Sequence, residues 1–319
     1  MAKTKFFLLP ILVLSLASLA TWGQRGGPPQ RIANPQTIHL EGGSRVEFRE
    51  FSSPALGEQG EYSILLPPAY DQEPNRQFPV IYFLHGMNND HTSWAVERYG
   101  NIPLLVNNLL LEGKIPQFLM VYPNGHNTFY TDLLDGTQKN EQFIHKDLIQ
   151  EIEKNFRVKS GRENRAIAGT SMGGYGALKI AMKHPELYSS VVAGSPIVLL
   201  GEDPSEQILA SPSRRAEFFV RLFQPVFGMP FDRDHWLENS VEVLARNADL
   251  KDLRIYMSYG TEDRYRDAFP MEQGIETIDQ ILTEREISHV FRVFEGEPHG
   301  WALIGAHLDE AIEHLTETF

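Results

Sequence analysis

Residues 166–178, with the sequence AIAGTSMGGYGAL, constrain the fold of this chain more than any other stretch. An apolar, strand-like segment leads into a sharp turn, and the residues after the turn are suited to a helix. Ser171 lies at the apex between Gly169 and Gly173. The backbone around a serine at such a turn is crowded, and glycines remove the β-carbons that would collide there. The pattern predicts a nucleophilic serine displayed on a strand-to-helix turn.

Apolar and amphipathic segments alternate along the chain after residue 78. The near-continuous apolar run 78–84 is typical of a strand covered on both faces of a sheet. Further strands are predicted before Ser171 and over 118–122, 190–193, 253–259 and 290–294, with helices over 104–111, roughly 140–156, after Ser171 and over 275–282. This alternation predicts an α/β fold with a doubly wound, mostly parallel sheet.

The N-terminal strands and one insertion depart from this alternation, and a C-terminal helix ends it. Residues 38–48 alternate around Gly42-Gly43 and, with 62–66, predict N-terminal antiparallel strands. Residues of about 200–250 read as a helical insertion. After the last strand, one C-terminal helix is predicted from apolar residues at helical spacing, which are Trp301, Ile304, Leu308, Ile312 and Leu315.

Polar segments follow three of the predicted strands. Ser171 follows one, Gly260-Thr261-Glu262-Asp263 follows the strand at 253–259, and Gly296-Glu297-Pro298-His299-Gly300 follows the last. The carboxyl ends of parallel strands meet at one edge of a sheet, where ligands bind. A serine, then an acid, then a histidine is the chain order of α/β-hydrolases.

Nucleophilic catalysis by a serine requires these residue types. A serine hydroxyl needs a base to take its proton, and the pKa of histidine suits that task. A carboxylate then fixes the imidazole tautomer and stabilises its charge. We predict that Ser171 is the nucleophile, His299 the general base and then acid, and Asp263 the orienting acid. Glu262 is the alternative acid.

His307 and His314 are alternative bases, but both fall within the predicted C-terminal helix, where a solvated or capping role is ordinary. An oxyanion hole needs two backbone N–H donors. We predict Met172, directly after the nucleophile, and Met87, in the loop after His85-Gly86.

The first 23 residues predict a cleavable signal peptide. Two lysines precede an apolar run over 6–14, and 18–20 (Ser-Leu-Ala) offers small residues at a cleavage site. The run is short for a membrane span, so an uncleaved anchor is the less favoured alternative. A flexible leader over 24–36 and one domain over 37–319 are expected to follow.

Composition narrows the function classes. The chain has 319 residues and no cysteine, which excludes a lipid-modified cysteine, disulfides, thiol nucleophiles and Cys-ligated metals. A net charge of −13 with no basic stripe argues against binding nucleic acid or anionic lipid. We expect a secreted or periplasmic protein. The oligomeric state is left open.

Five segments together resemble the Putative esterase family, which includes feruloyl esterases, acetyl-xylan esterases, S-formylglutathione hydrolases, enterochelin esterases and the antigen 85 mycolyltransferases. They are YSILLPPAY (62–70), FPVIYFLHGM (78–87), GTSMGG (169–174), GTED (260–263) and PHGW (298–301). The resemblance implies an α/β-hydrolase fold and carboxylic-ester hydrolysis through an acyl-enzyme, with no metal or organic cofactor. It also implies the triad Ser171, Asp263 and His299, with Met87 and Met172 as oxyanion donors.

Two segments depart from the family pattern. Glu297-Pro298-His299-Gly300-Trp301 stands where the family often has Gly-Gly-His before Asp-Trp, and Ala69 stands where many members have glycine. The segment 227–234 is similar to the insertion of feruloyl-esterase-like members, which favours acylated carbohydrates or small-molecule esters as substrates. Three tryptophans are candidates for an aromatic acyl pocket, namely Trp94, Trp236 and Trp301. An acyltransferase of the mycolyltransferase type and a non-catalytic binding protein on the same fold stay open as alternatives.

Overall fold

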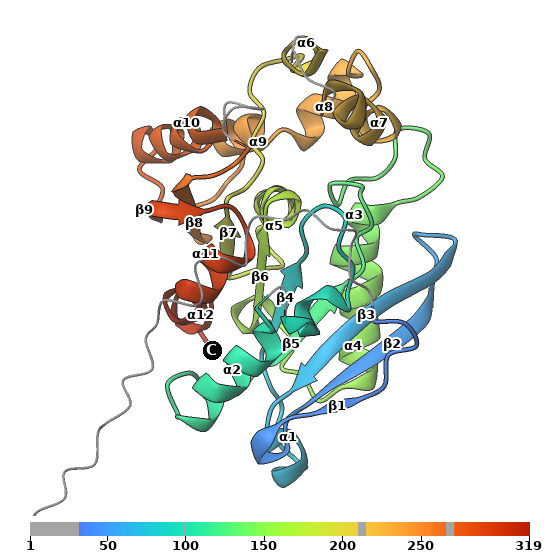
Figure 1. The fold of residues 1–319 in the computed structure, drawn as a ribbon, viewed down its shortest axis with the longest axis vertical. Coiled ribbons are helices and arrows are strands. Elements are labelled where there is room, and N and C mark those ends of the chain that lie inside the picture. Colours follow the sequence, from blue (N-terminus) through green and yellow to red (C-terminus); the bar gives the residue numbers. More distant parts are fainter. Residues whose placement is uncertain (1–31, 98–99, 210–214, 266–270) are drawn as a thin grey trace, which may run out of the picture.

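The computed structural model describes residues 32–97, 100–209, 215–265 and 271–319. The predicted signal peptide and most of the predicted leader lie outside them. Within these residues, nine strands form one sheet in the order β1-β2-β3-β5-β4-β6-β7-β8-β9 (Figure 1). The strands are β1 (Ile38–His39), β2 (Arg45–Ser53), β3 (Glu58–Leu66), β4 (Val80–Leu84), β5 (Leu119–Pro123), β6 (Arg165–Thr170), β7 (Ser190–Gly194), β8 (Arg254–Glu262) and β9 (His289–Pro298).

The sheet is mixed in the way that the sequence predicts. β1, β2, β3 and β5 pair antiparallel in turn. β5 and every strand beyond it pair parallel. The predicted α/β architecture, with N-terminal antiparallel strands on a mostly parallel sheet, is therefore confirmed.

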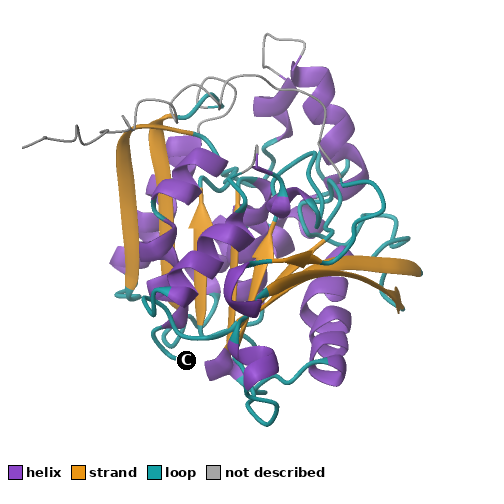
Figure 2. Ribbon diagram, turned by 60° about the horizontal axis from the view of Figure 1, so that its bottom comes forward, coloured by secondary structure: helices purple, strands orange, loops and turns teal. Residues whose placement is uncertain are grey.

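Helices cover both faces of the sheet (Figure 2). Along β4, Val80 and Tyr82 belong to one hydrophobic cluster and Ile81 and Phe83 to another, because successive side chains point to opposite faces. Residues of α2 (Ile102–Leu111), α11 (Trp301–Ala306) and α12 (Leu308–Thr316) pack in the second cluster. The first cluster contains α4 (Ile149–Asn155), α5 (Met172–Lys183) and α10 (Met271–Glu284), together with the insertion. Short helical turns complete the chain, namely α1 (Ala69–Gln72), η2 (Glu41–Gly43), η3 (Ser93–Ala95) and η6 (Arg162–Asn164).

The predicted insertion at about 200–250 is helical. It holds α6 (Ser205–Leu209), α7 (Arg215–Phe227), α8 (Arg233–Asn239) and α9 (Val241–Asn247), and Figure 1 shows α6, α7 and α8 at one end of the molecule, beyond α5. Asp232 and Ser240 cap α8 and α9 by accepting backbone N–H groups. Trp236 is 1% exposed and packs edge-on against Phe227, so it lies in the core and not in an acyl pocket.

Two helical predictions differ from the structure. The C-terminal helix is broken at His307, whose φ of −123° and ψ of 24° are not helical and whose ring stacks on Phe294 at 3.6 Å. The helix predicted over 140–156 contains a π-helical segment, η5 (Phe143–Leu148), between α3 (Asn140–Gln142) and α4. Hydrophobic spacing does not reveal either break, because the apolar face continues across both.

The described helices include none with both the length and the apolar character of a membrane span.

Candidate active site

Ser171 occupies a strained turn between β6 and α5. Its φ of 57° and ψ of −119° place it in a region that L-residues rarely adopt. A β-carbon on Gly169 would lie 2.2 Å from the carbonyl oxygen of Gly173, and one on Gly173 would lie 2.2 Å from that of Leu84. Both glycines are therefore required by close backbone approach, and together they hold the serine out at the end of the strand.

Asp263 and His299 are joined by a hydrogen bond. The His299 Nδ1 lies 2.5 Å from Asp263 Oδ2, and both side chains are nearly buried. The Tyr265 N–H donates to the other carboxylate oxygen at 2.9 Å, and the Tyr265 ring lies edge-on to the imidazole at 4.7 Å. Glu262, the alternative acid, is exposed. The structure thus brings Asp263 and not Glu262 to His299.

Close packing of β8 against β9 produces that contact. A β-carbon on Gly260 would lie 2.2 Å from the carbonyl oxygen of Glu297, so the loops carrying the acid and the histidine can approach only because residue 260 is glycine. The alternative bases lie elsewhere. His307 stacks on Phe294, and burial lowers the pKa of His314 to about 4.

Backbone contacts connect the serine to the same edge of the sheet. The Ser171 N–H donates to the carbonyl of Gly194 at the end of β7, and the Ser195 N–H donates to that of Ser258 on β8. The carboxyl ends of β6, β7 and β8 are therefore in line, with Ser171 at one end and the Asp263 loop at the other.

Two backbone donors flank Ser171. Met172 is the first residue of α5, so its N–H has no acceptor within the helix. Met87 lies in the turn after β4. Within the described part of the chain, neither N–H donates to another protein group. Met87 and Met172 stay the predicted oxyanion donors.

His85 is fully buried next to this turn and fixes its backbone. Its Nε2 accepts from the Gly125 N–H at 3.0 Å, which assigns the proton to Nδ1, and Nδ1 donates to the Gly86 carbonyl at 2.8 Å. Burial lowers the pKa of His85 to about 4, so the ring is neutral at ordinary pH. Sequence reasoning used His85-Gly86 only to locate a turn, and the role of the ring was missed.

The neutral state of His85 predicts acid sensitivity. A histidine with a folded pKa of about 4 and an unfolded pKa of about 6.5 stabilises the fold fully above pH 6.5, and this stability is lost as the pH falls from 6.5 to 4. Between pH 7 and pH 5 this group should remove about 2 kcal/mol from the free energy of unfolding. Urea unfolding at both pH values would measure it. The free energy of unfolding of His85→Asn, which has no titrating ring, should fall correspondingly less between pH 7 and pH 5. An equal fall in the variant and the unmodified protein would contradict the assignment.

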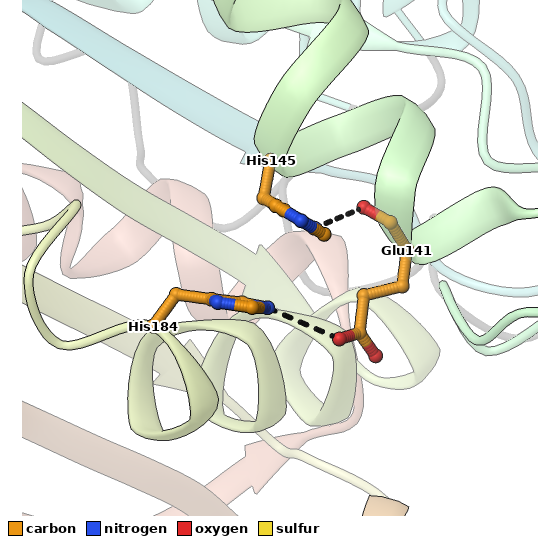
Figure 3. A group of neighbouring side chains, drawn as sticks. All are labelled: Glu141, His145 and His184. Carbon is orange, nitrogen blue, oxygen red and sulfur yellow. Dashed lines mark hydrogen bonds and ion pairs between the residues drawn. The ribbon is translucent and has the colours of Figure 1, made fainter. Parts of the chain in front are cut away.

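A second polar cluster lies at the carboxyl end of α5, where His184 follows the helix, and contains Glu141, His145 and His184 (Figure 3). The potential ligand atoms of these residues lie within 4.8 Å of one another. The Glu141 carboxylate pairs with Lys179 Nζ at 2.6 Å and Lys183 Nζ at 2.9 Å. Burial alone would raise the pKa of Glu141, but Lys179, His184 and Lys183 outweigh it and hold that pKa far below its usual range. A metal ion would have to displace these ammonium groups. We therefore interpret Glu141, Lys179 and Lys183 as an ion-pair hub.

The remaining aromatic candidates do not form a described pocket. Trp94 is fully buried against Phe83, with ring centroids 4.3 Å apart, and belongs to the core. Trp301 begins α11, and its side chain lies outside what the structure describes.

Comparison with known proteins supports one family. The family model described as Putative esterase matches residues 53–315. The chain is 33% identical over 144 residues to an endo-1,4-beta-xylanase/feruloyl esterase of Xylanibacter ruminicola, covering 43% of this chain but only 20% of that protein. It is 26% identical over 290 residues to an S-formylglutathione hydrolase of Paracoccus denitrificans, covering 86% of this chain and 94% of that protein.

Solved structures agree on the fold. A ferulic acid esterase superposes with a TM-score of 0.70 at 24% identity, covering 86% of this chain and 98% of that one. An S-formylglutathione hydrolase from Agrobacterium tumefaciens superposes with a TM-score of 0.68 at 19% identity, covering 89% and 98%. The α/β-hydrolase fold is therefore confirmed, and the chain belongs to the Putative esterase family.

Proposed function

We propose that this protein is a serine carboxylic-ester hydrolase that acts through Ser171, His299 and Asp263. The observation that carries the proposal is the 2.5 Å hydrogen bond between His299 and Asp263, at the sheet edge where the strained turn displays Ser171. Family membership supports the same reaction class. A non-catalytic binding protein would not need a nearly buried carboxylate–imidazole pair at the sheet edge that carries the strained Ser171 turn.

The proposed reaction has two steps. His299 removes the Ser171 proton while Ser171 Oγ attacks the ester carbonyl, and the resulting oxyanion accepts hydrogen bonds from the Met87 and Met172 N–H groups. His299 then protonates the leaving alcohol, which leaves an acyl group on Ser171. In the second step, His299 activates a water molecule that releases the acid and restores the serine.

The substrates that we propose are acylated carbohydrates or small-molecule esters. The relatives are named as feruloyl esterase, acetyl esterase and S-formylglutathione hydrolase, so acetyl and feruloyl esters are the first to compare. We also propose export with removal of the signal peptide, from the predicted segment at residues 1–23. N-terminal sequencing of the protein secreted by an expressing cell would test it.

A panel of p-nitrophenyl acetate, p-nitrophenyl butyrate, methyl ferulate and a longer-chain ester tests the proposal on the mature protein. We expect kcat/KM to differ by at least tenfold across the panel, because an acyl pocket discriminates by size and shape. Added sugar acceptor separates the alternatives, since a transferase would form acylated sugar in place of free acid. Absence of turnover on every ester would overturn the proposal.

A further inference from the structure

The loop between β5 and α3 carries a buried tyrosine in an unusual backbone conformation. Tyr130 has a φ of 53° and is fully buried. Two glycines make room for its ring, because a β-carbon on Gly125 would lie 2.0 Å from it and one on Gly176 would lie 2.5 Å from it. Gly176 belongs to α5, the helix that begins directly after Ser171. The Tyr130 ring therefore packs between this loop and α5.

The Tyr130 hydroxyl reaches the turn that contains Met87. It donates to the His85 carbonyl at 3.0 Å, and His85 Nδ1 in turn donates to the Gly86 carbonyl at 2.8 Å. The Gly86 carbonyl and the Met87 N–H belong to one planar peptide group, so a bond that holds the carbonyl also sets the direction of the N–H. A further bond to the Gly86 carbonyl comes from the Asn89 N–H at 3.3 Å.

The other end of Tyr130 is attached to the ion-pair hub. Lys179 Nζ donates to the Tyr130 carbonyl at 2.7 Å and to Thr131 Oγ1 at 2.9 Å, while it pairs with Glu141. Burial raises the pKa of the Tyr130 phenol far above its ordinary value, so the hydroxyl keeps its proton and donates. The tyrosine is thus fixed at its backbone by a buried cation and at its hydroxyl by the strand end that precedes Gly86.

We propose that Tyr130 is a positioning residue for the oxyanion hole, acting through His85 and Gly86 to aim the Met87 N–H at the substrate oxygen. This inference rests on the proposed function, because it needs an oxyanion to form beside Met87. Tyr130 does not touch the substrate in this arrangement. Its contribution is made when charge develops on the carbonyl oxygen, since a donor that is already oriented pays no reorganisation cost at that moment.

Tyr130→Phe tests the inference, because it removes the hydroxyl and keeps the ring. Removal of a whole oxyanion donor costs roughly 10²–10³ in kcat, so misdirection of one should lower kcat for p-nitrophenyl acetate by about tenfold and leave KM within about twofold. The inhibition constant of a trifluoromethyl ketone, whose adduct with serine carries an oxyanion, should rise by about the same factor. A purely structural tyrosine would not move kcat and this constant together.

Tyr62→Phe is the matched control. Tyr62 is also buried, and its hydroxyl donates to Glu151 at 3.3 Å on an element remote from Ser171. This variant should leave kcat and the inhibition constant unchanged. Equal effects of the two variants, or an unchanged kcat in a folded Tyr130→Phe protein, would overturn the inference.

Two variants of His85 keep the inference testable if Tyr130→Phe does not fold. His85→Asn places an amide donor near the position of Nδ1 and should retain more of kcat than His85→Leu, which has no donor. Where Tyr130→Phe does fold, adding it to His85→Leu should change kcat by less than about twofold, since both act through Gly86. Equal activity of the two His85 variants would overturn the inference. Absence of turnover by the unmodified protein would instead refute the proposed function, so the two failures are distinguishable.

Discussion

Ser171→Ala is expected to lower kcat for p-nitrophenyl acetate by roughly a million-fold. The substitution removes the hydroxyl that we propose forms the acyl-enzyme, while the Met87 and Met172 N–H groups and the binding surface are left in place. The residual rate reflects those groups alone. Steady-state kinetics on the variant, together with mass spectrometry of the unmodified protein quenched during turnover of a slow ester, would measure both the rate and the acyl adduct.

The turn itself should survive this change, because alanine fits a position whose strain comes from the backbone and whose two flanking glycines are retained. A midpoint of thermal unfolding within a few degrees of that of the unmodified protein would verify that the turn is retained. Ser195→Ala is a suitable control, since Ser195 is fully buried at the end of the neighbouring strand β7. Full activity of Ser171→Ala protein would refute the nucleophile assignment.

Asp263→Asn is expected to lower kcat on the order of 10⁴-fold. Asp263 Oδ2 accepts the proton of His299 Nδ1, and an amide nitrogen at that place would donate instead and favour the wrong tautomer of the imidazole. The Tyr265 N–H can still donate to the amide oxygen, so the loop should keep its conformation. Steady-state kinetics on folded variant protein, compared with Ser171→Ala, would give the loss.

Glu262→Gln provides the matched control at the neighbouring position. Glu262 is exposed, so its change should alter kcat by less than about threefold. A large loss in Glu262→Gln with little effect of Asp263→Asn would show that the acid is assigned wrongly.

Much of the fold follows from local signals in the chain. The apolar run at 78–84 predicts a doubly covered strand because its successive residues pack in two different clusters. The N-terminal hairpin and the helical insertion are also predicted correctly. The breaks at His307 and within 143–148 are not predictable in this way, since they depend on ring stacking and on a π-helical segment that leave the apolar spacing unchanged.

The candidate site is also predictable only in part from local sequence patterns. Ser171, Asp263 and His299 are identified by their places after strands, and their roles stay predictions. Tyr130, His85 and Lys179 escape sequence reasoning, because their importance arises from hydrogen bonds between segments 40 to 50 residues apart. Gly125 and Gly176 are the sequence feature that points to Tyr130, since each leaves space for its ring.

The position of β9 at the sheet edge makes esterase activity depend on the pairing of a single strand. Among the described residues, β9 is the last strand, lies at one edge of the sheet and pairs with β8 alone, and His299 follows it directly. Because we propose His299 as the general base, we expect a nascent chain to have no esterase activity until β9 pairs with β8. Local unfolding of β9 should likewise abolish turnover while the rest of the sheet stays folded. In a denaturant titration, esterase activity should then be lost at a lower denaturant concentration than the circular dichroism signal of global unfolding.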